Sequence, residues 1–276
     1  MNKQFRYLAI ARALIAFSTF LVLILNNEVT LFGMENGLNH FSSKYEAWNI
    51  FFLLGVEEIF LMKLVAIGVL VLSFIGILPR FTILLQLWVH WSFINGSITI
   101  EGGDQVAYLV ILFLTPLFLI DNRMHMWKKF DGKISKFKLE LIRFCINLVK
   151  IQAAIIYFVA SVGKYPVEQW LNGTSIYYWF VDPTFGLPDF LMTIFNPLMK
   201  SGWFMFFMGW SVLILELSLA TGFIIKNKYK KYLFIGGIGM HFSIFLFHGL
   251  PNFMLSMIGI LIIYLLIDTN KLEEVI

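Results

Sequence analysis

Eight apolar runs, most of them about as long as a transmembrane helix, limit what this chain can fold into. A helix needs about 20 apolar residues to cross the hydrocarbon core of a bilayer. Backbone polar groups in that core must be paired within the segment, which favours helices. We therefore expect an all-α membrane protein, a bundle of about eight transmembrane helices forming a single domain over residues 1–276. The runs are 7–25, 59–78, 81–98, 105–120, 139–163, 203–225, 232–249 and 253–267.

The composition is typical of a protein embedded in a lipid bilayer, which is its expected partner. Hydrophobic residues make up 59% of the sequence and charged residues 14%, against roughly half and a quarter in an average soluble domain. The net charge of +4 is modest and its bases are scattered over short segments, so nucleic-acid binding is not indicated. Cys145 is the only cysteine, which excludes an internal disulfide, and no metal-binding spacing occurs.

Basic residues in the short connecting segments predict the orientation of the helices, because such residues remain on the cytoplasmic side. They alternate with acidic segments along the chain, which places both termini in the cytoplasm and the protein in the cell (cytoplasmic) membrane as a multi-pass protein. The basic residues are Lys3, Arg6, Arg80, Arg123, Lys128, Lys129, Lys133, Lys136, Lys138, Lys226, Lys228, Lys230 and Lys231. The acidic residues of the outer segments are Glu28, Glu35, Glu46, Glu101, Asp104, Glu168, Asp182 and Asp189.

Two outer segments are predicted to be more than connectors. Residues 187–198 carry apolar side chains at helical spacing, with Pro188 in the first turn. This pattern predicts a short amphipathic helix on the outer face, or a lid over a cavity. Trp48, Phe51 and Phe52 predict an interfacial stretch before the second run.

Arg12, inside the first run, is expected to snorkel towards the headgroups.

Charged residues within the runs need a partner or a task, since each costs roughly 2.5–3.5 kcal/mol at the centre of a helix on insertion scales. Glu216 lies near the middle of the sixth run, where it either holds helices together or serves a site. Lys164 closes the outer end of the fifth run. It is either an anchor in the headgroups or, if desolvated in a cavity, a base.

Further polar residues share helix faces with these two. Tyr157 precedes Lys164 by seven residues and Gln152 lies close to the same stripe, while His241 and His248 are also seven apart. We predict an outward-opening cavity that contains Lys164, Glu216 and His241. His90 follows Gln86 by one turn, as a hydrogen-bonded structural histidine or as a ligand.

The segment 152–164 reads QAAIIYFVASVGK and is followed by Trp170 and by Gly173-Thr174. It resembles the membrane domain of vitamin K-dependent gamma-carboxylase and its bacterial relatives, the HTTM family. The likeness extends from about the third run onward. Its other motifs are His90, Asn95-Gly96 with Asp104, Leu215-Glu216-Leu217-Ser218, Met240-His241-Phe242 and Pro251-Asn252-Phe253-Met254.

This resemblance implies roles for particular residues. Lys164 falls on the lysine that deprotonates vitamin K hydroquinone in the carboxylase, and Gly163 replaces the lysine before it. Glu216 falls where the carboxylase has an aspartate, and His241 falls on a histidine. The implied catalytic residues are therefore Lys164, Glu216 and His241. Reduced quinone is the implied cofactor, with Gln152, Tyr157 and His90 as its contacts and no metal.

Among small bacterial members, the chain most resembles SdpB-type proteins in length and in its Tyr177-Tyr178-Trp179 run. Such proteins are encoded beside a secreted peptide toxin and are needed, with a soluble partner, to produce its mature form. The resemblance implies maturation of an exported antimicrobial peptide toxin, a bacteriocin, with the peptide precursor and an SdpA-like protein as partners. Two alternatives stay open, a quinone-dependent oxidoreductase or carboxylase-like enzyme and a non-enzymatic immunity or scaffold protein. Because only one of these two alternatives is an enzyme, the sequence leaves open whether this protein catalyses a reaction.

Overall fold

The computed structural model describes residues 3–33, 46–129 and 135–275. Over these residues the chain is helical and has no strand, only an isolated bridge between Ile77 and His125, which confirms the all-α prediction. Glu35 and Lys133, on which the predicted orientation partly depends, lie outside the described residues. The chain divides into two compact units, unit 1 with Met1–Val149, Pro251–Ile263 and Ile267–Ile276, and unit 2 with Lys150–Leu250 and Tyr264–Leu266. The single domain stays a prediction.

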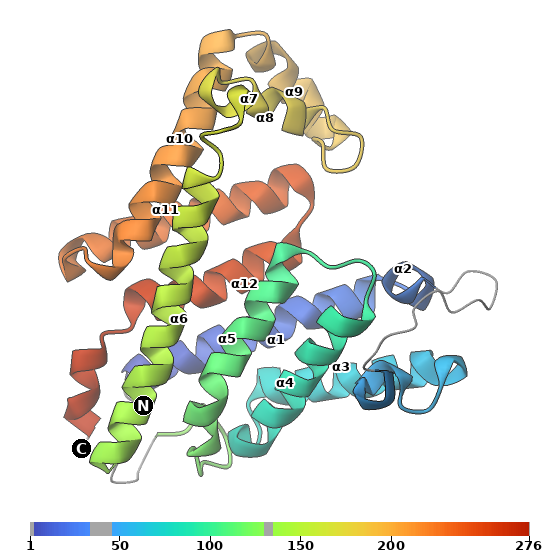
Figure 1. Cartoon of the computed structure of the whole chain (residues 1–276), viewed down its shortest axis with the longest axis vertical. Helices are drawn as coiled ribbons and strands as arrows, with labels where there is room; N and C mark the ends of the chain where they lie inside the picture. Colours follow the sequence, from blue (N-terminus) through green and yellow to red (C-terminus); the bar gives the residue numbers. More distant parts are fainter. Residues whose placement is uncertain (1–2, 34–45, 130–134, 276) are drawn as a thin grey trace. The chain divides into compact units, whose positions relative to one another are not determined.

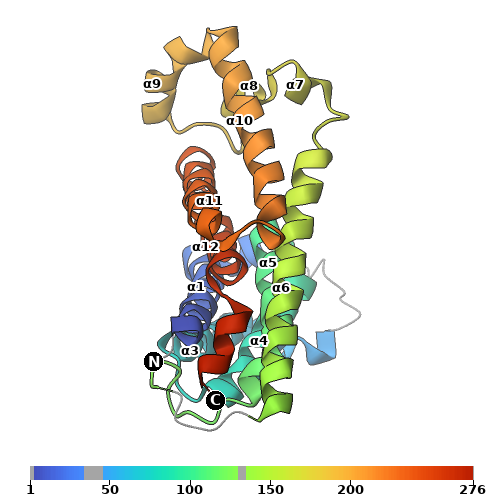
Figure 2. The same ribbon diagram turned by 90° about the vertical axis from the view of Figure 1, so that its left-hand side faces the viewer.

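Unit 1 is built around the helices α1, α3, α4, α5 and α12, which pack in a closed order. Helix α1 packs on α3, α3 on α4, α4 on α5, α5 on α12, and α12 returns to α1 (Figures 1 and 2). Its elements are α1 (Lys3–Leu25), α2 (Glu28–Phe32), α3 (Ile59–Ile75), α4 (Pro79–Gly96), α5 (Gly102–Leu119), the first part of α6 (Lys136–Val162) and α12 (Pro251–Leu261). Short 3₁₀ segments cover Glu46–Trp48, Ile50–Phe52, Val56–Glu58 and Thr269–Val275. The π-helical turn Ile262–Leu266 follows α12, and its last residues, Tyr264–Leu266, belong to unit 2.

Small residues let α1 and α12 approach each other closely. A Cβ placed on Gly259 would lie 3.2 Å from the backbone oxygen of Ala11 and 2.9 Å from the Ile15 side chain. Near this crossing the Ser256 hydroxyl donates to the Ser18 hydroxyl at 2.9 Å. Small and hydroxyl-bearing residues are what helix interfaces in lipid use, because packing and hydrogen bonds replace the hydrophobic effect there.

The start of α5 makes a similarly tight contact with α12, and it supplies a test of this packing. A Cβ on Gly103 would come within 2.7 Å of the Phe253 Cα, whereas one on Gly102 would meet only the Phe253 ring at 3.4 Å. We expect Gly103→Ala to lower the free energy of unfolding by about 1–3 kcal/mol, because backbone must move. Thermal unfolding in detergent measures this loss. Gly102→Ala is the matched control, and equal midpoints for the two variants would contradict the predicted contact.

Phenylalanines of the segment before α3 lie inside unit 1. Phe51 and Phe52 are almost fully buried, and the Phe51 ring packs against Phe32 and Phe93. The predicted interfacial stretch is therefore wrong for these two side chains, since packing within the unit competes successfully with the membrane surface. Trp48 remains 73% exposed, as the prediction requires.

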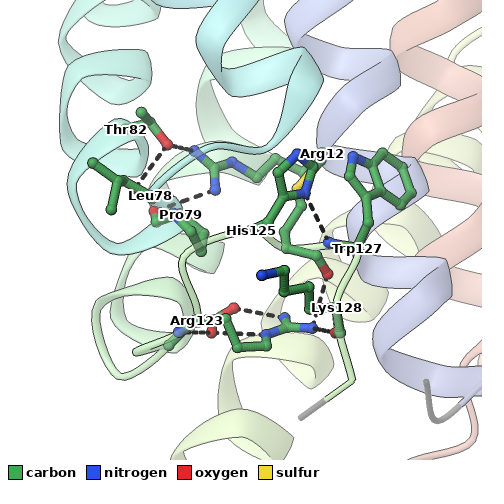
Figure 3. Close-up of polar contacts among 10 residues, drawn as sticks. Arg12, Leu78, Pro79, Thr82, Arg123, His125, Trp127 and Lys128 are labelled. Carbon is green, nitrogen blue, oxygen red and sulfur yellow. Dashed lines mark hydrogen bonds and ion pairs between the residues drawn. The ribbon is translucent and has the colours of Figure 1, made fainter.

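Arg12 is buried completely, so the expected snorkelling is wrong. Its guanidinium donates to the Thr82 hydroxyl at 2.9 Å, to the Gln86 amide oxygen at 2.9 Å and to the backbone oxygen of Pro79 at 3.2 Å. It also lies over the Phe118 ring, 4.6 Å from the centroid. Figure 3 shows the guanidinium directed at Thr82 and Pro79. Acceptors from α4 replace the water that a snorkelling arginine would seek.

The basic segment after α5 is held by its own polar contacts. Arg123 forms an ion pair with Asp121 at 2.6 Å and donates to the backbone oxygens of Met126 and Lys128 (Figure 3). The Trp127 indole donates to the backbone oxygen of Ile75 at 2.6 Å. This segment is thereby tied to the end of α3.

Unit 2 combines the second part of α6 with five further helices. Helix α10 packs against α7, α8, α9 and α11 (Figure 1). The bounds are α7 (Glu168–Leu171), α8 (Ser175–Phe180), α9 (Asp189–Met199), α10 (Gly202–Ala220), a 3₁₀ turn at Thr221–Phe223 and α11 (Asn227–His248).

The amphipathic helix predicted over residues 187–198 is present as α9, with Pro188 immediately before its first turn. Leu191 is buried in a cluster with Phe180, whereas Phe190 and Ile194 on the other side are more than 60% exposed. An apolar exposed side is consistent with contact to lipid. Its position on an outer membrane face stays a prediction.

A helix occupies each of the eight predicted runs, but not all of them have the length and composition of a membrane span. Within the described residues, five helices are long and apolar enough to cross a membrane, and Pro251–Leu266 is apolar but shorter. Several long apolar helices fit a multi-pass membrane protein. The count of eight spans and the cytoplasmic termini stay predictions. The five are Lys3–Leu25, Val56–Ile75, Gly102–Leu119, Lys136–Val162 and Gly202–Phe223.

Candidate functional site

Lys164 and Glu216 form an ion pair in unit 2. The Lys164 ammonium lies 2.7 Å from each carboxylate oxygen of Glu216 and 2.9 Å from the backbone oxygen of Ala160. It also lies 5.2 Å from the centroid of the Trp170 ring. Ala160 belongs to the last turn of α6, where carbonyls have no partner within the helix and attract a cation. The end of α6 thus positions the lysine, and α10 carries its counter-ion.

The pair is largely shielded from water. The Glu216 side chain is 10% exposed and that of Lys164 is 22% exposed. Opposite charges interact more strongly in such surroundings than in water, but removing both from water has its own cost. The pairing fits the prediction that Glu216 holds helices together and equally the prediction that it serves a site. A cavity beside the pair favours the second.

Tyr157 and His241 form a second polar contact, more deeply buried than the first. The Tyr157 hydroxyl lies 2.9 Å from Nε2 of His241, and both side chains are almost fully buried. On the same part of α6, the Ser161 hydroxyl donates to the backbone oxygen of Leu213 at 3.1 Å. Helices α6, α10 and α11 are thus joined by polar contacts.

The contact between Tyr157 and His241 can be tested by removing one hydroxyl. We expect Tyr157→Phe to lower the free energy of unfolding by roughly 1–3 kcal/mol, because a buried imidazole nitrogen loses its partner. Thermal unfolding of the purified variant measures this loss. Tyr165→Phe is the control, since Tyr165 is 37% exposed. A Tyr157→Phe protein as stable as the control would show that the hydroxyl contributes nothing.

A cavity of about 500 Å³ lies beside the ion pair. This volume is within the range of about 300–1,000 Å³ typical of small-molecule sites. Lys164 and Glu216 form its charged wall, and most of the other lining is apolar or aromatic. The lining residues are Lys164, Trp170, Ile176, Trp179, Phe180, Phe185, Met208, Ser211, Val212, Leu215, Glu216, Met240, Ser243, Ile244, Phe247, His248 and Leu250.

Helix α9, the predicted lid, packs behind the lining of the cavity, since Phe195 contacts Phe180 and Phe247. The lining comes from Lys164 after α6, from α7, α8, α10 and α11, and from the segments that contain Phe185 and Leu250, and no residue of α9 contributes within the part of the chain described. Nδ1 of His248 lies 2.6 Å from the backbone oxygen of Phe185, and its ring packs against Trp179. His248 therefore tethers the segment that contains Phe185 to the end of α11.

The structure brings four of the six predicted site residues into contact as two pairs, Lys164 with Glu216 and Tyr157 with His241. Of the six, only Lys164 and Glu216 line the cavity. Gln152 is half-buried on α6 and is not among the lining residues. The predicted catalytic and cofactor roles remain predictions.

His90 belongs to unit 1, where both ring nitrogens have partners. Nδ1 lies 2.7 Å from the backbone oxygen of Gln86, and Nε2 lies 3.2 Å from the Thr19 hydroxyl. These are the contacts of a hydrogen-bonded structural histidine. Among the described residues no group of histidine, cysteine, aspartate and glutamate side chains suits a metal ion.

Sequence reasoning did not single out Lys63, although it is buried. Its ammonium pairs with Glu28 and donates to the backbone oxygen of Asn26 at 3.1 Å. Burial raises the pKa of Glu28, but the hydrogen bond and charge of Lys63 outweigh that effect and leave it below its ordinary value. A signal was available, because Lys63 lies one turn inside the second run with Glu28 in the preceding outer segment.

The apolar lining of the cavity was also missed. Phe180, Met240 and Phe247 look in the sequence like any lipid-facing side chain, because an apolar residue carries no mark of whether it faces lipid, core or cavity. Only the aromatic run at 177–179 was noted, and of its three residues Trp179 lines the cavity.

Comparison with known proteins identifies the family. The chain is 34% identical over 259 residues to sporulation-delaying protein SdpB of Bacillus subtilis (strain 168), which covers 93% of this chain and 80% of that protein. This chain belongs to the SdpB family. It is also 30% identical over 269 residues to the uncharacterized protein YitO of the same strain, covering 93% of this chain and 84% of YitO. The predicted SdpB-type resemblance is therefore confirmed.

Two further comparisons found no match. No family model matches the chain, and no solved structure does. The resemblance of this SdpB family member to the HTTM family and to gamma-carboxylase therefore rests on the sequence motifs alone.

Proposed function

We propose that this SdpB family member acts in the production of an exported antimicrobial peptide toxin at the cytoplasmic membrane. The observation that carries the proposal is the similarity to sporulation-delaying protein SdpB over 93% of the chain. The proposed partners are the exported peptide precursor and a soluble SdpA-like protein. Both termini lie in the cytoplasm in this proposal, and the cavity of unit 2 opens towards the outer face.

The cavity is the proposed working site. Its lining is mostly apolar, with Lys164 and Glu216 on one wall, so it favours a ligand with a large apolar body and a small polar group. An apolar stretch of a peptide precursor has this character, since its side chains are apolar and its backbone carries N–H groups. In this proposal Glu216 meets the ligand and Lys164 holds Glu216 in place, while His241 joins α11 to α6 through Tyr157 behind the cavity.

A second candidate is a quinone-dependent oxidoreductase or carboxylase-like enzyme of the HTTM type. The observation that favours it is Lys164 on the wall of the apolar cavity, at the position that the resemblance assigns to a base. Purified protein given reduced menaquinone or vitamin K and oxygen should then form the epoxide. Lys164→Ala should lose this reaction, and no turnover by the wild type across several lipid compositions would count against the candidate.

Deleting the gene tests the main proposal. Mature extracellular toxin should disappear while its precursor persists, and both should return to normal when the wild-type gene is restored. Immunoblots of cell and medium fractions follow the two forms. Normal amounts of mature toxin in the deletion strain would end the proposal. An immunity or scaffold protein predicts instead that Lys164→Ala and His241→Ala complement the deletion fully.

A further inference from the structure

The hydrogen bonds of Lys164 leave it with nothing to offer a ligand. An ammonium group has three N–H donors. Two donate to the carboxylate oxygens of Glu216 and the third to the backbone oxygen of Ala160. A ligand that sought a cation would have to break one of these contacts.

Glu216 differs from its partner in this respect. A carboxylate accepts about four hydrogen bonds, two at each oxygen, and Lys164 supplies one to each. Because Glu216 lines the cavity, its remaining acceptor sites are available to a ligand there. The charged wall of the cavity therefore offers a hydrogen-bond acceptor.

The hydroxyl groups of the lining are committed to their own helices. The Ser211 hydroxyl donates to the backbone oxygen of Met208 at 2.7 Å, and that of Ser243 donates to Gly239 at 2.8 Å. Their donors do not compete with a ligand for Glu216. Since the ion pair has no net charge, a ligand with its own carboxylate would place a second negative charge beside one cation in apolar surroundings, which is costly.

We propose that the cavity binds a neutral, largely apolar ligand whose hydroxyl or N–H group donates a hydrogen bond to Glu216. Lys164 is then a positioning residue, which keeps the carboxylate ionised and directed at the ligand. The inference rests on the proposed function in taking this cavity as the working site, and it names the class of substrate that the site accepts.

Naphthalene derivatives test the proposal, because they share one apolar body and differ in a single group. The probes are 1-naphthol, which donates, 1-methoxynaphthalene, which does not, and 1-naphthoate, which is an anion. Full-length protein in nanodiscs is titrated with each probe by calorimetry, and the signal from empty nanodiscs is subtracted to remove partitioning into lipid. We expect 1-naphthol to bind about tenfold or more tightly than 1-methoxynaphthalene, as a hydrogen bond to a charged group provides.

Glu216→Gln should change the preference as well as the strength. It removes the counter-ion of Lys164, so 1-naphthoate should become the preferred probe and the advantage of 1-naphthol should fall. Glu140→Gln is the matched control, since the Glu140 side chain is 65% exposed in its ion pair with Arg143 and is outside the cavity lining. It should bind all three probes as the wild type does.

The wild-type titrations decide the proposal even if Glu216→Gln fails to fold. A preference for 1-naphthoate would show that Lys164 meets the ligand as a free cation, and equal affinities for 1-naphthol and its methyl ether would show that no acceptor is used. Either result overturns the inference. Probe binding does not depend on toxin production, so a normal toxin level in the deletion strain would sink the proposed function and leave the selectivity of the cavity measurable.

Discussion

Lys164→Met is expected to lower the free energy of unfolding by roughly 2–4 kcal/mol and to abolish the production of mature toxin. Removing one member of a shielded ion pair leaves the other charge uncompensated, here the Glu216 carboxylate, whose side chain is only 10% exposed. Methionine retains the length and most of the apolar surface of the lysine, so lost packing contributes little. Thermal unfolding in detergent measures the stability, and complementation of the deletion strain measures the function.

The double variant Lys164→Met/Glu216→Leu separates the two effects. With both charges gone, apolar packing should restore most of the lost stability, because a shielded ion pair often contributes little more than an apolar pair of similar size. Toxin production should remain absent, since no acceptor is left at the cavity wall. A stable and active double variant would show that the pair only joins helices. Glu140→Gln, whose side chain is 65% exposed in its ion pair with Arg143, should change neither readout much.

Arg12→Met is expected to cost about 3–5 kcal/mol in unit 1. The guanidinium is fully buried and serves three acceptors, on Thr82, Gln86 and Pro79. Losing it leaves buried acceptors without their donor, and methionine does not fill the space of the guanidinium. Reduced accumulation in the membrane and a lower thermal midpoint should both follow.

Arg80→Met is the matched control for this change. Arg80 donates to the Asn122 side chain at an exposed position, so its loss should cost well below 1 kcal/mol. Equal stability of the two variants would mean that the Arg12 contacts are replaceable by water. That result would support a snorkelling arginine after all.

Some features of the fold were predictable because their cause is local. The helix α9 was expected from the spacing of apolar residues over 187–198, and the eight apolar runs each contain a helix. Spacing along a helix needs no knowledge of distant residues. The same pattern does not fix the number of membrane spans, since α4 and α11 carry polar residues that lower their mean hydropathy.

Other predictions were wrong because the residues that decide them are distant in the chain. Arg12 was expected to reach for headgroups, but Thr82 and Gln86, about 70 residues away, supply acceptors inside the unit. Phe51 and Phe52 were expected at an interface, but Phe32 and Phe93 provide a core for them. A residue's own neighbours in sequence do not reveal such partners.

The sequence by itself determined that helices form, where they lie along the chain, and that Lys164, Glu216, Tyr157 and His241 needed an explanation. These conclusions follow from local spacing and from the cost of placing polar groups in hydrocarbon. Only the tertiary structure decided that Lys164 pairs with Glu216, 52 residues away, and Tyr157 with His241, 84 residues away. Hydrogen bonds are set by distances of about 3 Å in space, and separation along the chain carries no information on that distance.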